Sequence, residues 1–163
     1  MTDGLFMREV NKVAEEYPDV EYDDYLVDAM AAYLVRHPQN FDVIVSTNFY
    51  SDILSDLASE LSGSIGLAGS IMASDDCCAA QAQHGSAPDI EGQDKANPTS
   101  MALSCAMLLE WMGAHQNKPD LSEAGAALSA AIDKTLDNPA TRTTDLGGTL
   151  GCKAFGEAIA ANL

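Results

Sequence analysis

The segment Phe41-Asp42-Val43-Ile44-Val45-Ser46-Thr47 places the tightest constraint on the fold. Its residues are mostly apolar and rich in β-branched side chains, which is typical of a strand buried on both faces of an α/β sheet. Helical patterns flank it, over 3–17 and 28–35 before it and from about Asp52 after it, and Val20-Glu21-Tyr22 is interpreted as a short strand. This alternation of helix and strand predicts the α/β class, with a thin parallel sheet.

The middle of the chain, residues 63–97, differs from the rest in composition and in hydrophobic pattern. It is rich in glycine and shows little periodicity, so it predicts a long loop of the kind that is usually functional. Helices return after it. They are predicted from Asn97-Pro98 to about Met112 with Gly113 as the end, from a capping box at 120–123 to about Leu136, and from about Cys152 to Ala161. With so few strands among these helices, the chain resembles one whose strands have lost their partners.

Composition excludes several classes of partner. The chain has 163 residues, which indicates one domain or a piece of a larger one. Its 25 acidic and 8 basic residues give a net charge of -17, so binding of nucleic acid through a basic surface is excluded and anionic membranes are disfavoured. No apolar run approaches the roughly 18 to 20 residues that span a bilayer. We therefore expect no nucleic-acid partner and no membrane partner.

The first residues and the cysteines bear on the compartment. The start Met1-Thr2-Asp3-Gly4-Leu5-Phe6 lacks a basic region and an apolar core, so no signal peptide is visible. None of the four cysteines has the C-x-x-C spacing of a metal site, and reduced thiols are the simpler interpretation. These features predict a cytoplasmic protein, or one of the mitochondrial matrix if the source is a eukaryote.

Two carboxylates are candidates for a metal site. Asp52 and Asp56 are four residues apart at the start of a predicted helix, so they share one face and both can reach one hard cation. Mg²⁺ and Mn²⁺ favour such oxygen ligands and keep open positions for the oxygens of a substrate. The competing interpretation is that acidic residues in a first turn merely stabilise the helix dipole, and it applies to Asp28 as well.

A loop around His84-Gly85-Ser86-Ala87-Pro88-Asp89-Ile90 is a candidate nucleotide site. Its small residues let the backbone approach a ligand closely. An acidic side chain such as Asp89 can accept hydrogen bonds from both ribose hydroxyls of NAD and would repel the 2′-phosphate of NADP. The segment is not G-x-G-x-x-G, so a plain turn with a surface acid and a structural His84 remains the alternative.

The ordered motifs nevertheless resemble those of the β-decarboxylating dehydrogenases, which act on isocitrate, homoisocitrate, 3-isopropylmalate or tartrate. The start Thr-Asp-Gly-Leu-Phe and the motif Asn-Phe-Tyr are most similar to the NAD-dependent isocitrate and homoisocitrate enzymes. The matching motifs are Asp28 in Leu-Val-Asp-Ala-Met, 41–45, 48–58, Gly63-Ser64-Ile65-Gly66-Leu67, 84–92, Ala96-Asn97-Pro98-Thr99 and Arg142-Thr143-Thr144-Asp145-Leu146-Gly147-Gly148.

The resemblance implies roles for individual residues. Asp52 and Asp56 would hold Mg²⁺ or Mn²⁺ together with the substrate, and Asp28 would arrive from the other subunit of a homodimer. Asp89 matches the position that selects NAD, because NADP-using relatives carry a lysine there. The implied cofactor-binding residues are His84, Gly85, Ser86, Ala87, Pro88, Asp89, Ile90 and Asn97.

The resemblance also implies an incomplete fold. It predicts the C-terminal part of a two-domain isopropylmalate dehydrogenase-like α/β fold, apparently truncated at the N-terminus. Residues 1–63 would belong to the second domain, with the metal and the dimer interface, and residues 64–163 to the first, cofactor-binding domain. The family's catalytic lysine and tyrosine and its substrate-clamping arginines fall in the absent half. We therefore assign no catalytic residue and expect little or no turnover by the isolated chain.

Two departures from the family pattern keep a second hypothesis open. Ala80-Gln81-Ala82 stands where the family has Phe-Glu-Pro or Phe-Glu-Ala, and Ser51 replaces the usual glycine beside the first metal aspartate. The first hypothesis is the C-terminal portion of an NAD-dependent oxidative decarboxylase of a small 2-hydroxy acid, with isocitrate favoured over 3-isopropylmalate and homoisocitrate. The alternative is a non-catalytic nucleotide-binding or regulatory subunit of such a dehydrogenase.

Overall fold

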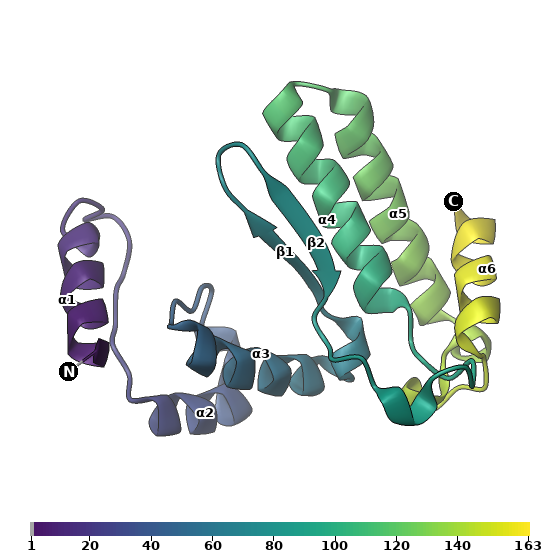
Figure 1. The fold of residues 1–163 in the computed structure, drawn as a ribbon, viewed down its shortest axis with the longest axis horizontal. Coiled ribbons are helices and arrows are strands. Elements are labelled where there is room, and N and C mark those ends of the chain that lie inside the picture. Colours follow the sequence, from purple (N-terminus) through teal and green to yellow (C-terminus); the bar gives the residue numbers. More distant parts are fainter. Residues whose placement is uncertain (1) are drawn as a thin grey trace. The chain divides into compact units, whose positions relative to one another are not determined.

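The computed structural model describes residues 2–163 and divides into two compact units, one up to Ala58 and the other from Ser59 to Leu163. The division falls within helix α3 (Asn48–Ser62), a few residues before the expected boundary at residue 63. The assignment of the units to two domains of a larger fold remains a prediction. Figure 1 shows the elements in chain order.

The first unit is helical and has a small core. It contains α1 (Thr2–Ala14), α2 (Val27–Arg36), the 3-10 turn η1 (Pro38–Asn40) and most of α3. Met30 and Leu34 are four residues apart, so they share one face of α2, and both pack against Leu54 of α3. The predicted helices are therefore present, although α3 begins four residues before Asp52, at Asn48.

The strands predicted in the first unit are absent from the described residues. Phe41–Thr47 has no regular secondary structure and bends at Asp42, and Val20–Tyr22 is irregular. A strand is stabilised by hydrogen bonds to a neighbouring strand, and no described segment lies beside either stretch to supply them. The side chains that a sheet would bury are instead open, and that of Val43 is 88% exposed.

The second unit contains a hairpin where the sequence predicts only a loop. β1 (Gly69–Ala73) and β2 (Cys78–Ala82) pair antiparallel, from Gly69 opposite Ala82 to Ala73 opposite Cys78. The tight turn between them is closed by Ser74, whose N–H donates to the Cys77 carbonyl at 2.8 Å. The predicted parallel sheet is thus wrong for the described residues: the only sheet they form is this two-stranded antiparallel one.

Helices α4 (Thr99–Gln116) and α5 (Pro119–Asp137) form an antiparallel pair, and the hairpin lies along α4 (Figure 1). The helix predicted to end at Gly113 continues to Gln116, where Asn117 adopts a left-handed conformation with φ of 52°. The expected capping box at 120–123 is wrong: the N-cap of α5 is Lys118, two residues before Asp120, and Pro119 lies in the first turn.

Two glycines allow α4 and α5 to approach closely. A Cβ atom on Gly113 would lie 2.1 Å from Ser122 Oγ, and one on Gly125 would lie 2.7 Å from the Ala106 carbonyl oxygen. Gly113 therefore serves the helix contact and not the helix end. Helix α6 (Cys152–Asn162), predicted within one residue at its end, packs on α5.

The core of the second unit lies between α5 and α6. Ile132 and Phe155 are fully buried, and Ala131 and Ile159 complete the cluster. Leucines from the neighbouring elements pack around it. None of the described helices combines the length and the hydrophobicity needed to cross a bilayer.

Candidate functional site

Two buried serines of α4 hold the base of the hairpin. Ser100 and Ser104 are fully buried, and each hydroxyl bridges the backbone on both sides of the hairpin. Ser100 Oγ donates to Ala68 O at 2.5 Å and accepts from Gln83 N at 3.0 Å, whereas Ser104 Oγ donates to Gln81 O at 2.7 Å and accepts from Ser70 N at 2.9 Å. The end of β2, from which the candidate nucleotide loop leaves, is therefore fixed on α4.

The loop that follows β2 carries the predicted cofactor-binding residues on its surface. It runs through His84 and Gly85 to the 3-10 turn η3 (Pro88–Ile90), and Ala87 has a left-handed backbone with φ of 43°. A Cβ atom on Gly85 would meet no atom within 4 Å. Asp89 is exposed in the first turn of η3, and its carboxylate accepts no hydrogen bond from the described residues. This loop therefore offers open backbone and one unpaired carboxylate.

Asn97 lies at the far end of the same loop and is buried. Its Oδ1 accepts from the backbone N–H of Thr99 at 3.0 Å, which satisfies one of the unpaired donors at the start of α4. Its Nδ2 donates to Asp145 Oδ2 at 2.9 Å. Both ends of the amide are therefore used to shape the loop, and Asn97 would meet a ligand through its backbone.

Asp145 joins three segments that are distant in sequence. It lies in the 3-10 turn η5 (Thr144–Leu146), and its carboxylate accepts hydrogen bonds from Ser64 Oγ at 2.6 Å, Asn97 Nδ2 at 2.9 Å and Thr143 Oγ1 at 2.5 Å. Partial desolvation alone would raise the pKa of this carboxyl, but the three side-chain hydrogen bonds outweigh it, and the pKa is lowered from its usual value. Asp145 is thus an ionised anchor of the loop.

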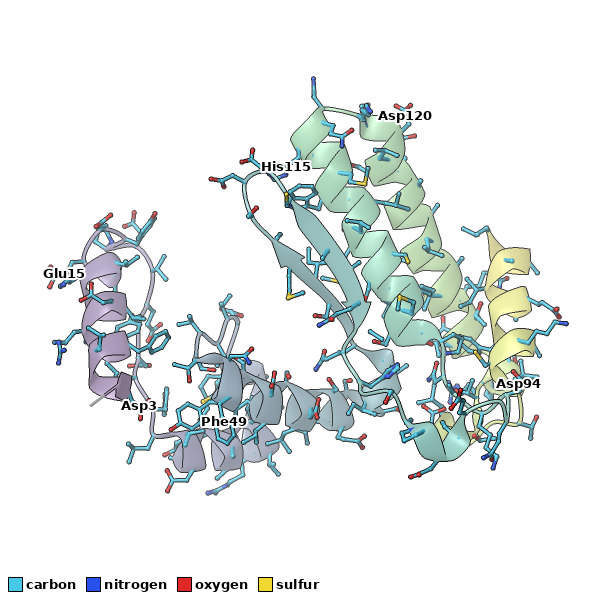
Figure 2. All side chains as sticks on the ribbon, viewed as in Figure 1. Asp3, Glu15, Phe49, Asp94, His115 and Asp120 are labelled. Atoms are coloured by element: carbon cyan, nitrogen blue, oxygen red, sulfur yellow. The ribbon has the colours of Figure 1, made fainter. Side chains whose placement is uncertain are left out.

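Asp94 lies beside the start of α6 (Figure 2) and fixes the loop to it through hydrogen bonds. Its Oδ1 accepts from Lys153 N at 2.8 Å, and its backbone carbonyl accepts from Cys152 N at 3.0 Å. A Cβ atom on Gly151 would lie 2.2 Å from Asp94 Oδ2, so only glycine fits there. The side chain of Asp94 therefore caps the amino end of α6.

The candidate metal ligands lie on the first unit. Asp52 and Asp56 are exposed and one turn apart on α3, and neither carboxylate has a hydrogen bond or ion pair to a described residue. Asp28 is exposed at the start of α2, where its Oδ1 accepts from the Ala29 N–H at 2.8 Å. Among residues 2–163, no three acidic, histidine or cysteine side chains gather into a metal cluster.

The comparison with protein families decides what kind of chain this is. The model for isocitrate/isopropylmalate dehydrogenase matches residues 1–159. The chain belongs to this family. It is 45% identical to the homoisocitrate dehydrogenase of Methanocaldococcus jannaschii over 98% of its own length, and 40% identical to the mitochondrial catalytic subunit 5 of NAD isocitrate dehydrogenase from Arabidopsis thaliana over 99%.

Solved structures of the family have the same fold. The crystal structure of isocitrate dehydrogenase from Methylococcus capsulatus superposes with a TM-score of 0.88 at 38% identity, over 98% of this chain and 45% of that one. The expected fold class, a C-terminal part of the isopropylmalate dehydrogenase-like fold, is confirmed. The chain spans less than half the length of the curated relatives it matches, 43% of the M. jannaschii enzyme and 42% of the A. thaliana one.

The chain has polar groups that suit both expected ligands, a divalent cation and a dinucleotide. Two open carboxylates on one helical turn match the oxygen chemistry of Mg²⁺ or Mn²⁺, although they supply only part of a coordination shell. The loop residues 84–90 suit a dinucleotide, because Asp89 is free to accept from hydroxyl groups and the backbone at Gly85 is open. The fit rests on these carboxylates and on the open backbone of the loop.

The sequence motifs name candidate ligand-binding residues, but they give no role to the residues that shape the loop. The resemblance includes Asp145 in its C-terminal turn without a role, and it omits Asp94. Their partners are 48 and 59 residues distant from them, at Asn97 and Lys153. No local pattern signals such contacts. The acid in the turn Thr-Thr-Asp-Leu-Gly-Gly is the only hint the sequence offers.

Proposed function

We propose that this chain supplies the metal-binding and nucleotide-binding portions of an NAD-dependent oxidative decarboxylase of a 2-hydroxy acid. Isocitrate is the favoured substrate, with homoisocitrate and 3-isopropylmalate as the other members of the class. Membership of the family supports the type of reaction. The observation that carries the assignment is the pair Asp52 and Asp56, open and one turn apart on α3.

In this proposal the two α3 carboxylates bind Mg²⁺ or Mn²⁺ through oxygen atoms. When bound, such an ion polarises the oxygen of the oxidised substrate and stabilises the negative charge that develops as carbon dioxide leaves. Asp52 and Asp56 fix the ion from one side and leave its other positions to the substrate. Because no third acidic side chain joins them among the described residues, the proposal takes Asp28 from a second subunit of a homodimer.

The loop from His84 to Ile90, with the backbone at Asn97, binds the adenosine part of NAD in this proposal. Asp89 accepts hydrogen bonds from the two ribose hydroxyls, and its charge repels the 2′-phosphate of NADP. Asp145 and Asp94 contribute indirectly, because their hydrogen bonds fix the two ends of the segment that carries the loop. Preference for NAD over NADP is therefore assigned to one exposed carboxylate.

Binding is the property that the chain alone should retain. Turnover is expected to be little or none, because the lysine, tyrosine and arginines implied by the family resemblance have no counterpart among the residues assigned here. Loss of the general acid and base together with the substrate clamp removes most of an enzyme's rate enhancement, which is commonly 10⁶-fold or more. Binding and turnover are therefore measured separately.

Isothermal titration of the purified chain with Mn²⁺ and with NAD tests the assignment. We expect Asp52→Asn to abolish Mn²⁺ binding, and the matched Asp42→Asn, which removes an equally exposed acid from the same unit, to leave it unchanged. We expect Asp89→Asn to weaken NAD and to reduce the preference over NADP, whereas the neighbouring Glu91→Gln should do neither. Circular dichroism of each variant verifies the fold.

Equal effects of the site and control substitutions would contradict the assignment. So would NADP binding as tightly as NAD to the unaltered chain, because the repulsion from Asp89 would then be absent. Substantial turnover by the chain alone would refute the expectation of incompleteness, and would require a catalytic acid and base among residues 1–163.

A non-catalytic nucleotide-binding or regulatory subunit is the second candidate function. The observation that favours it is Ala80-Gln81-Ala82, which the structure places in β2 just before the loop, where the resemblance calls for an aromatic and an acidic side chain. Such a subunit would bind NAD and Mn²⁺ in the same assays. The two candidate functions are distinguished when the chain is combined with the part of a relative that it does not match. Only the first candidate then gives turnover.

A further inference from the structure

The candidate nucleotide loop forms hydrogen bonds to the rest of the second unit only at its two ends. Residues 84–93 bond to one another, as Gln93 Nε2 does to the Asp89 carbonyl at 2.7 Å. None of them has a hydrogen bond to a described residue outside this range. A segment with so few bonds to its surroundings is mobile unless the residues at its ends hold it, so the ends decide where the loop lies.

The far end of the loop is held by two residues. Asp94 accepts from the Lys153 N–H at 2.8 Å, and Asn97 donates to Asp145 at 2.9 Å. The near end has only one residue between the loop and the end of β2, which is Gln83. The direction in which the chain enters the loop at His84 therefore depends on how firmly Gln83 is held.

Gln83 is half-buried and bonds to two different helices. Its backbone N–H donates to Ser100 Oγ of α4 at 3.0 Å, and its side-chain Nε2 donates to Ser59 Oγ of α3 at 2.8 Å. The first bond places the peptide at the end of β2. The second holds the side chain in one conformation from a different element, so the residue before His84 is held at two points.

Ser59 is a fixed point for this second bond. It lies in the last turn of α3, within the second unit, and is only 4% exposed. Its carbonyl accepts from Ser62 Oγ at 2.7 Å, and Glu60 Oε1 accepts from the Ile65 N–H at 3.1 Å, which holds the chain just after the helix. A buried hydroxyl in an ordered turn needs its partners, so Ser59 and Gln83 hold each other in place.

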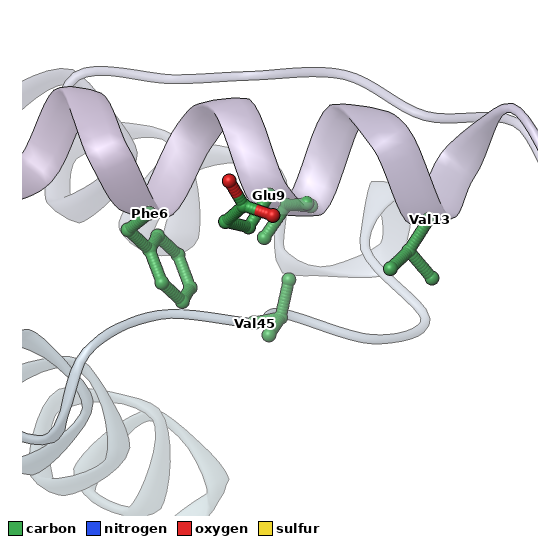
Figure 3. A pocket seen from close by; sticks show the side chains of 5 residues that line it. Phe6, Glu9, Val13 and Val45 are labelled. Atoms are coloured by element: carbon green, nitrogen blue, oxygen red, sulfur yellow. The ribbon is translucent and has the colours of Figure 1, made fainter.

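A hollow in the first unit is a poor alternative site for a nucleotide. It measures about 340 Å³, and Phe6 and Val13 of α1 face Val45 across it (Figure 3). Of its other two lining residues, Val10 is apolar and Glu9 is acidic, so it would repel phosphate groups. Nucleotide sites need well-placed polar groups, which this hollow lacks. Nucleotide binding is therefore better assigned to the loop and to the residues that hold it.

We propose that Gln83 is a positioning residue for the nucleotide: its bond to Ser59 holds the start of the loop so that the backbone at His84 and Gly85 meets the ligand in one conformation. This inference rests on the proposed binding of NAD to the loop. Gln83 acts through the loop and not by touching the ligand. A loop that is already in position loses less conformational freedom on binding, and the ligand binds more tightly for that reason.

Isothermal titration with NAD tests the role of the pair. Gln83→Met keeps the length of the side chain and removes the donor, and we expect it to weaken NAD binding about fivefold to tenfold, the worth of one hydrogen bond. Ser59→Ala should weaken it by a similar factor. The double variant should lose no more than either single one, because each substitution breaks the same bond. The matched control Gln116→Met, at an exposed glutamine that ends α4, should stay within about twofold of the unaltered chain.

Nuclear magnetic resonance of the ligand-free chain supplies a reading that a general loss of stability would not give. The side-chain amide protons of Gln83 should exchange slowly in the unaltered chain and at least about tenfold faster in Ser59→Ala. The backbone amide of Gly85 should also exchange faster in both variants. The amide of Ile132, in the core of the second unit, should exchange at an unchanged rate.

Three results would overturn the positioning role while leaving the proposed function in place. They are NAD binding that neither variant weakens, losses that add fully in the double variant, and an equal loss in Gln116→Met. Failure of the unaltered chain to bind NAD would instead refute the proposed nucleotide site, and the role of Gln83 with it. The titration of the unaltered chain thus distinguishes the two failures.

Discussion

Asp145→Asn removes the charge at the centre of the loop network while keeping the shape of the side chain. In the folded protein the carboxylate accepts from Ser64, Asn97 and Thr143. The amide of the variant can still accept through its oxygen from Ser64 and Asn97, and it can donate to the Thr143 hydroxyl, which can rotate. What is lost is the extra strength that a negative charge gives to the hydrogen bonds it accepts.

The magnitude follows from the bonds. A hydrogen bond to a charged group contributes about 1.5–3 kcal/mol, against about 1 kcal/mol for a neutral one. Three such differences would total about 3 kcal/mol if the group were buried, but the Asp145 side chain is exposed by area, so solvent screening reduces the sum. We expect a loss of about 1 kcal/mol in the free energy of unfolding of the second unit.

The pH dependence gives the sharper test. Because the pKa of Asp145 is lowered in the folded protein, its contribution to stability is complete above the pKa of a free aspartate, about 3.9, and is lost as the pH falls through the lower folded value. The difference between the unaltered protein and Asp145→Asn should therefore be largest at pH 7 and shrink below pH 4. Urea unfolding, followed by circular dichroism, measures it at each pH.

Asp75→Asn is the matched control, because it removes the same charge from the exposed hairpin turn, where the carboxylate has no hydrogen bond to a described residue. It corrects for the general benefit of reducing a net charge of -17. Equal stability of the two variants at pH 7 would refute the anchoring role of Asp145. A difference that grows toward acid pH would refute the sign of its pKa shift.

Three further outcomes follow from the packing of the second unit. Gly125→Ala should destabilise the folded protein by about 1–3 kcal/mol in thermal unfolding, because the added methyl group meets the α4 backbone. Gly156→Ala should instead stabilise it by up to about 1 kcal/mol, because a Cβ atom at Gly156 would meet no atom within 4 Å. Ser104→Ala should lower the free energy of unfolding in urea by about 1–3 kcal/mol, and the control Ser129→Ala should lower it by less than about 0.5 kcal/mol. Equal losses in the two variants would show that the buried Ser104 hydroxyl does not hold the hairpin. Asp94→Ala should speed amide exchange in the first turn of α6, and unchanged exchange would rule out the cap.

The helices could be predicted from the sequence because their signals are local. The spacing of Met30 and Leu34 marks the buried face of α2, and the pattern at 120–123 predicts the start of α5 within two residues, although not through a capping box. Gly113 was the exception. Its position suggested a helix end, but a glycine is also what a close helix contact needs, and only the position of Ser122 distinguishes the two.

The hairpin and the loop anchors could not be predicted, for a different reason. β2 reads Cys-Ala-Ala-Gln-Ala, which has almost no strand propensity, and it is held in place by serines that lie 17 and 23 residues away on α4. Asp145 bonds to Ser64 over 81 residues. Tertiary contacts of this kind override local preference, and a single sequence carries no trace of them.

The prediction of a strand at Phe41–Thr47 was wrong for the described fold, yet its physical basis is sound. The residues have the propensity and the apolar pattern of a central strand, and the exposed fractions show that none of the described residues covers them. A sequence encodes the environment a segment needs. Here residues 2–163 do not supply that environment, so a local strand pattern is not enough to form a strand.

The small core of the first unit links its folding to metal binding at the carboxylate pair. A unit with so small a core is expected to populate its ordered state only in part, and the apparent affinity of any ligand is reduced by that fraction. If the ordered state is populated about a tenth of the time, Mn²⁺ binds about tenfold more weakly to the chain than it would to a fully ordered unit. Linkage is reciprocal, so Mn²⁺ must stabilise the ordered state of the first unit, and it must lose that effect when Asp52 is replaced by asparagine.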